Sequence, residues 1–189
     1  MAKIGRTGFG QVEPNHLSGI VTGQINAQLP AHKKAKDAAA NVAASIEILE
    51  QGQFAKYDYA NNEVNFTGAG EWMLVYNEEQ LYDERLQAHK DFALQANNFI
   101  GGVKTPRLIK TNIGDIFTTN TFGAATSNVA EVEGIEVSVG TVLKVDKTTG
   151  YLVLGTDANA DANGPQFQVV ATTTVPDGVD AAAKVMRIK

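Results

Sequence analysis

The 189-residue sequence contains no cysteine, only three histidines and one tryptophan. Without cysteine, the chain has no disulfides, no thiolate metal sites and no cysteine nucleophile. His16, His32 and His89 show no metal-ligand spacing, and none has a sequence neighbour suited to orient it as a general base. We therefore predict no catalytic residue, no cofactor-binding residue and no metal ligand, and we expect that the chain is not an enzyme.

An excess of positive charge and long apolar runs are also missing. The formal net charge is -5, whereas a nucleic-acid binder would present a basic face to the phosphates. No run of residues is apolar for long enough to cross a bilayer, and the first residues lack the apolar core of a signal peptide. We predict neither nucleic acid nor membrane as a partner, and we expect the protein to stay in the cytoplasm until it assembles.

Two motifs resemble ligand sites but are incomplete. The glycines within residues 5–10 have the wrong order for a dinucleotide fingerprint and follow no strand. Residues 157–164 place oxygen-bearing side chains at every second position, as a calcium loop does. Ala162 stands where such a loop needs glycine, and Gln168 stands where a glutamate would close the site. We predict a polar loop between strands at this place.

The first thirty residues are rich in glycine and carry only scattered apolar side chains. Such a segment buries too little apolar surface to order itself, so it is either a mobile terminus or an arm held by a partner. We favour an extended arm over residues 1–30. Its candidate partner-binding residues are Phe9, Val12, Leu17, Ile20, Ile25 and Leu29.

Residues 31–110 predict a small α+β region with one or two helices. The Ala-rich segment 32–51 has apolar residues at helical spacing, although residues 45–49 also fit a strand. The charged segment 77–98 is dominated by helix-forming residues and predicts a surface helix.

Strands are expected between these two helices. Residues 54–59 and 63–67 flank an Asn-Asn turn and predict a hairpin, and residues 71–76 predict a buried strand that completes a small meander. Trp72 and Tyr76 lie in this apolar strand, so we expect core positions for them rather than sugar-stacking ones.

Residues 111–189 predict a compact antiparallel β-barrel or sandwich, which makes the whole chain mainly β in an α+β arrangement. The strongest hairpin signal joins residues 142–145 to residues 151–154 through a polar turn that ends in glycine. Further strands are expected at residues 114–122, 134–140, 167–174 and 183–188. The predicted inward residues are Ile135, Val137, Val139, Leu143, Val145, Leu152, Leu154, Val169 and Val185.

This half has a regular rhythm of strands and turns, which is set by the segments 140–143, 150–154 and 168–171 and by the Pro-Asp-Gly turn at 176–178. That rhythm resembles the β-rich domain of head decoration proteins, or cement proteins, of tailed phages. The resemblance implies a non-enzymatic virion protein that stabilises the capsid. Its implied partners are the major capsid protein and copies of itself, for example in a trimer. The implied location is the capsid, after synthesis in the host cytoplasm.

An alternative from another class is a tail- or fibre-associated β-domain that recognises a host surface receptor or glycan. Phage fibre domains are also small β-structures, so architecture alone does not separate the two functions. The number of copies in each particle would separate them, because a cement protein covers the lattice and an adsorption protein is present in few copies.

Overall fold

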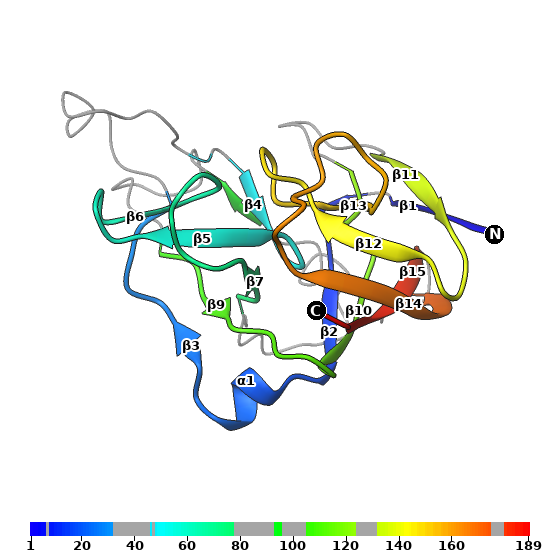
Figure 1. Ribbon diagram of the computed structural model, residues 1–189, viewed down its shortest axis with the longest axis horizontal. Coiled ribbons are helices and arrows are strands. Elements are labelled where there is room, and N and C mark those ends of the chain that lie inside the picture. Colours follow the sequence, from blue (N-terminus) through cyan, green and yellow to red (C-terminus); the bar gives the residue numbers. More distant parts are fainter. Residues whose placement is uncertain are drawn as a thin grey trace.

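The computed structural model describes residues 1–6, 8–31, 46, 48–77, 93–95, 105–123, 132–174 and 180–189. The structure is mainly β, with 48% of the described residues in strands and 3% in helices. Within these ranges the strands form several antiparallel sheets, and the helical segment is the four-residue α1 (Ser18–Val21) (Figure 1).

The largest sheet has six strands in the order β13-β12-β14-β15-β10-β2, and each strand is antiparallel to its neighbours. Its bounds are β2 (Val12–His16), β10 (Ile116–Thr119), β12 (Val142–Val145), β13 (Leu152–Leu154), β14 (Gln166–Thr174) and β15 (Ala181–Arg187). The strands predicted at residues 114–122, 167–174 and 183–188 are confirmed here with adjusted ends, as is the β12–β13 hairpin. The barrel alternative is wrong for the described strands, because none of their sheets closes on itself.

The N-terminal segment belongs to this part of the fold, so the prediction of an arm held mainly by other chains is wrong. β1 (Ala2–Arg6) pairs with β11 (Val132–Val137), and β2 forms the edge of the six-stranded sheet against β10. The physical reason is that pairing satisfies the backbone of a glycine-rich segment, while side chains at alternate positions reach a core made by distant residues. Ile4 is fully buried in this way.

A second sheet of five strands has the order β3-β9-β7-β5-β6, and Figure 1 shows it on the opposite side of the view from the six-stranded sheet. Its bounds are β3 (Ile25–Asn26), β5 (Phe54–Asp58), β6 (Glu63–Asn65), β7 (Met73–Val75) and β9 (Leu108–Ile109). The predicted β5–β6 hairpin and the β7 strand are confirmed. The meander order is wrong, because β7 pairs with β5 instead of β6.

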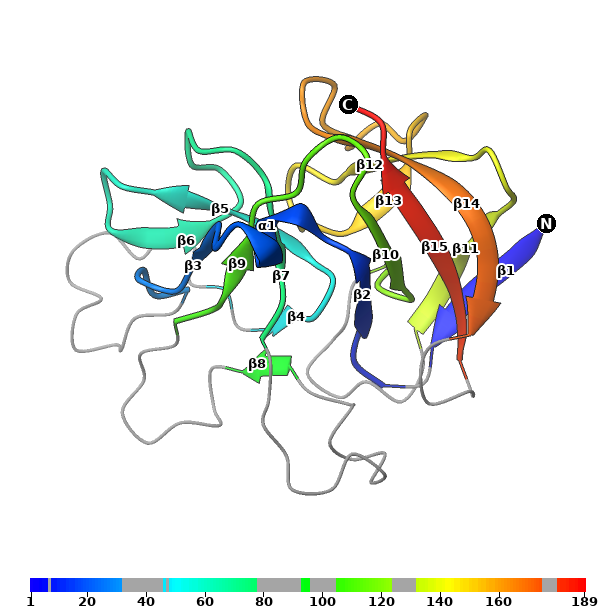
Figure 2. The ribbon, with the colours of Figure 1, turned by 90° about the horizontal axis from the view of Figure 1, so that it is seen from below.

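Most of the two predicted helices, residues 32–51 and 77–98, lies outside the described residues. Where the structure describes these segments, they form β4 (Ile48–Glu50) and β8 (Ala93–Gln95), which pair with each other, as Figure 2 shows. The helical prediction is therefore wrong at both C-terminal ends, and the strand alternative holds at Ile48 and Leu49. Leu49 and Leu94 stand opposite each other and are buried, an arrangement that helical spacing cannot reveal.

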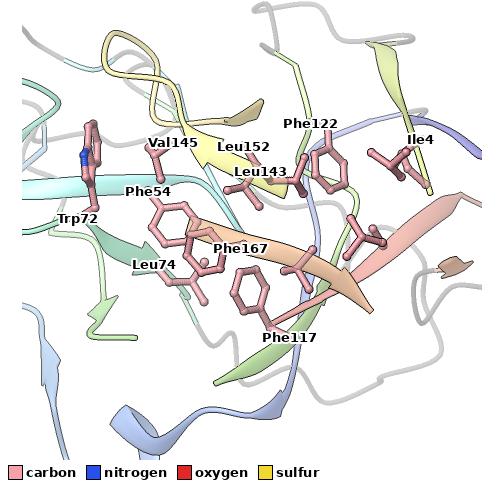
Figure 3. Close-up of a cluster of buried hydrophobic side chains, with 14 of the residues drawn as sticks. Ile4, Phe54, Trp72, Leu74, Phe117, Phe122, Leu143, Val145, Leu152 and Phe167 are labelled. Atoms are coloured by element: carbon pink, nitrogen blue, oxygen red, sulfur yellow. The ribbon is translucent and has the colours of Figure 1, made fainter. Parts of the chain in front are cut away.

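The main core joins residues from all three predicted segments. Its central contacts are aromatic: the ring of Phe167 lies 5.1 Å from that of Phe54 and 5.6 Å from that of Phe117, between centroids (Figure 3). Ile4 and Trp72 belong to the same cluster. The core therefore extends across the boundaries predicted at residues 30 and 110. A second buried cluster combines Tyr57 and Val64 of the five-stranded sheet with Leu49 of β4.

Most of the predicted inward residues are confirmed. Ile135 and Leu154 are half-buried against the main core, whereas Val139 is 67% exposed and its prediction is wrong. The reason is that β11 ends at Val137 and residues 138–141 form a turn, so the alternation continues in the sequence after the strand has stopped. The fully confirmed positions are Val137, Leu143, Val145, Leu152, Val169 and Val185.

Candidate interaction surfaces

The six predicted partner-binding residues are not brought together. Leu17 is buried in the main core, and Val12 and Ile25 pack against it. Leu29 packs against the second cluster, and Phe9 is half-buried. Among the six, Ile20 alone is classed as exposed, with 39% of its surface accessible.

Two further exposed apolar side chains lie on α1 and on the turn that is hydrogen-bonded to it, and the sequence did not mark them. Val21 is 84% exposed, and Ile113, in the turn before β10, is 73% exposed. We call Ile20, Val21 and Ile113 the apolar knob. The two backbone segments that carry the knob lie side by side, and α1 stands at the lower margin of the molecule in Figure 1.

Hydrogen bonds fix α1 to the turn that carries Ile113. The Ser18 amide donates to Asp115 Oδ1 over 3.0 Å, and Asn112 Nδ2 donates to Ser18 Oγ over 2.7 Å. The backbone of α1 also lies very close to that of Lys110: a Cβ at Gly19 would be 2.3 Å from the Lys110 carbonyl oxygen. The knob is thus held by the scaffold, although its side chains are exposed.

A cleft of about 410 Å³ lies at the five-stranded sheet, where residues of β3, β5 and β7 line it. We call it the aromatic cleft. It combines two tyrosines, two side-chain amides and an ion pair between Lys110 Nζ and Glu71 Oε1, 2.7 Å apart. Its principal lining residues are Gln24, Asn26, Tyr57, Tyr59, Glu71 and Lys110.

The two tyrosines form a stacked pair, with ring centroids 5.7 Å apart and planes inclined by 25°. Tyr57 is buried, and burial raises the pKa of its hydroxyl to about 12, against the opposite effect of the Gln28 backbone amide. Tyr59 is 70% exposed on top of it. The turn after Tyr59 is ordered by Asp58, whose Oδ1 accepts hydrogen bonds from the amides of Ala60 and Asn61.

A second cleft of about 290 Å³ shares Gly70 and Glu71 with the first. Trp72 lines this second cleft and is 4% exposed, as predicted for a core residue. Its indole Nε1 donates a hydrogen bond to Asp161 Oδ2 over 2.8 Å. The Lys56 ammonium lies 4.5 Å from the centre of the same ring. The hydrogen bond from Trp72 is the main cause that lowers the pKa of Asp161.

The group with the most suggestive chemistry is enclosed. Arg6 Nη1 and Nη2 donate to the two carboxylate oxygens of Glu50 over 2.6 and 2.8 Å, and both side chains are fully buried. Glu50 also accepts hydrogen bonds from the Gly10 amide and the Tyr151 hydroxyl. Because both side chains are fully buried and the bonds join distant strands, we interpret the group as a clamp that joins β1 to β4 and to the residue before β13.

The histidines and the calcium-like loop considered in the sequence are placed as follows in the described residues. His16 is exposed on β2, while His32 and His89 lie outside those residues. In the loop 157–164, Asp157 and Asp161 each accept a hydrogen bond from the amide two residues later, as in ordinary polar turns. Across the described ranges, no three His, Asp or Glu side chains are grouped for a metal ion.

Comparisons of the chain with protein-family models, with curated proteins and with solved structures find no match. Within the described part of the chain, no helix has both the length and the apolar character needed to cross a membrane.

Proposed function

We propose that this chain is a non-enzymatic virion structural protein, a capsid decoration protein that binds the outer face of the major capsid protein lattice. The observation that carries the proposal is the apolar knob, which exposes three branched aliphatic side chains from a scaffold that holds them in place. Single exposed aliphatic residues are common, and we expect these three to act together in a protein contact because they stand on two segments that are hydrogen-bonded to each other.

The binding energy expected from the knob is modest. Full burial of an aliphatic side chain contributes about 1.5 to 3 kcal/mol, and part of that is lost in ordering the two partners. A repeating lattice compensates for a weak contact, because each bound copy stabilises the assembled state by its own binding free energy. A second contact from a neighbouring copy, as in a trimer, would raise the affinity further.

The test is co-sedimentation of the purified protein with expanded capsids that lack decoration protein. We expect the full-length protein to bind and to raise the temperature at which the capsids open. The double variant Val21→Ser/Ile113→Ser should lose binding. The matched control is Val139→Ser, because Val139 is also highly exposed but lies in the turn after β11. Capsid binding that survives loss of the knob, or no binding by the full-length protein, would overturn the proposal.

The runner-up function is a tail- or fibre-associated domain that recognises a host receptor or glycan. The two functions differ in the number of copies in each particle, which quantitative gel analysis of purified virions measures. A copy number comparable to that of the major capsid protein supports decoration. A few copies per particle, together with tight binding to host envelopes, would replace it.

A further inference from the structure

We propose that the aromatic cleft binds an uncharged saccharide. The cleft is separate from the residues of the knob, so the inference does not depend on the proposed capsid contact. It rests on the exposed Tyr59 ring, the polar groups around it and the balance of charge in the cleft.

Tyr59 offers a flat face on a fixed base. Its ring lies over the buried Tyr57, and the turn that follows it is held by Asp58. The face of an aromatic ring is electron-rich and attracts the C–H groups on one side of a sugar ring. The Tyr59 side chain remains 70% accessible while it stacks on Tyr57, so its outer face is open to a ligand.

The polar groups around the ring suit hydroxyls, which both donate and accept hydrogen bonds. The side-chain amides of Gln24 and Asn26, which line the cleft, each supply donors and an acceptor. Glu71 lines the same cleft, and its neighbour Gly70 lies against the Tyr57 backbone, where a Cβ on Gly70 would be 2.7 Å from the carbonyl oxygen. A ligand on Tyr59 therefore meets hydrogen-bonding groups at its edges.

The charge of the cleft argues against an ionic ligand. Lys110 and Glu71 neutralise each other at 2.7 Å, and the Tyr57 hydroxyl remains protonated at neutral pH. Neither an anion nor a cation would find an unpaired opposite charge among these lining groups. The volume of about 410 Å³ falls within the range typical of small-ligand sites.

The experiment is a titration of the full chain, followed by NMR of its tyrosine ring protons. The probes are maltotriose, cellotriose and triacetylchitotriose. We expect at least one of them to bind with millimolar affinity or better and to shift the Tyr59 signals. If none of the three shifts these signals, the proposal is overturned.

Variants locate the site. Tyr59→Ala should weaken binding at least tenfold, which corresponds to about 1.4 kcal/mol or more. Tyr59→Phe keeps the ring, so its affinity should stay within about threefold of that of the parent. Asn26→Ala should weaken binding through loss of one amide. Val21→Ser is the matched control: it removes the knob's most exposed residue and should leave saccharide affinity unchanged.

Each remaining outcome also decides the matter. Equal affinity of the Tyr59→Ala and parent proteins would place the sugar elsewhere and overturn the inference. Tighter binding of a sialylated trisaccharide than of its neutral counterpart would contradict the uncharged class. Selective binding of an extended peptide along the edge of β3 would replace the saccharide. Far-UV circular dichroism of Tyr59→Ala checks folding, which the exposure of this ring should preserve.

Discussion

Replacing Glu50 by glutamine tests the buried clamp most directly. Glu50→Gln keeps the shape of the side chain but leaves the Arg6 guanidinium in the interior without its counter-ion, because both side chains are fully buried. Removing one partner of a buried ion pair typically costs about 3 to 5 kcal/mol. Total stabilities are about 5 to 15 kcal/mol, so the loss is a large part of the whole. For a chain of this length it corresponds to a fall in Tm of roughly 6 to 20 °C.

The assay is urea unfolding followed by circular dichroism, with Glu71→Gln as the matched control. The Lys110–Glu71 pair is equally short at 2.7 Å, but its two side chains are 39% and 48% exposed. An exposed pair contributes about 0.2 to 1 kcal/mol, so the control should be nearly silent. The double variant Arg6→Met/Glu50→Gln should lose less than the two single variants together, because it leaves no unpaired charge. Equal, small losses for Glu50→Gln and Glu71→Gln would refute burial as the source of the effect.

Three further predictions follow from strand pairing and burial. Deleting residues 1–16 removes β1, β2 and Arg6, so the truncated protein should aggregate or lose its cooperative unfolding transition. A soluble, cooperatively folded product would restore the arm hypothesis. Gly134→Ala should lower the free energy of unfolding, measured by urea titration, by about 1 to 3 kcal/mol or more, because the new Cβ would lie 1.2 Å from the Ile4 carbonyl oxygen. An unchanged urea midpoint would contradict the β1–β11 register. Val137→Asp should unfold the protein and Val139→Asp should be nearly silent, since Val137 is 1% and Val139 is 67% exposed; similar circular dichroism spectra for the two variants would contradict this burial pattern.

Local features of the fold could be predicted because neighbouring residues determine them. The turn between β12 and β13 is one case: Asp146 Oδ1 accepts hydrogen bonds from the amides of Thr148 and Thr149, and Gly150 takes a positive φ of 75°. Aspartate, threonine and glycine at these spacings are a turn signal in any sequence. The β5–β6 hairpin could be predicted for the same reason, because its turn contains paired asparagines, and Asn62 there has a positive φ.

Pairing between distant segments could not be predicted in this way. Ala2 lies opposite Val137, and Arg6 reaches Glu50 across the interior, yet no periodicity links these positions. A glycine-rich segment with scattered apolar residues looks the same whether it docks on its own chain or on another. The arm prediction treated residues 1–30 in isolation, and it was wrong because the rest of the chain supplies the missing core.

The surfaces were less predictable than the fold, because each combines separate segments. Ile20 was proposed as a partner-binding residue, but Val21 and Ile113 were not, because the segments that carry them are joined through contacts of Ser18 and Gly19 with residues 110–115. Tyr59 was assigned to a strand without any ligand role. Its cleft requires Gln24, Glu71 and Lys110, which are far apart in sequence and meet only in the five-stranded half.

The apolar knob and the aromatic cleft share their supporting backbone. The Lys110 amide donates to the Gln24 carbonyl oxygen over 3.1 Å, and both residues line the cleft. The carbonyl of Lys110 is the atom on which Gly19 of α1 packs, so the knob begins where the cleft wall ends. A partner that covers Val21 therefore approaches the rim of the cleft. Comparing the saccharide affinity of capsid-bound protein with that of free protein consequently measures how far the capsid contact extends beyond the knob. Equal affinities would confine the contact to α1 and the Ile113 turn. A lower affinity on capsids would extend the contact to Lys110.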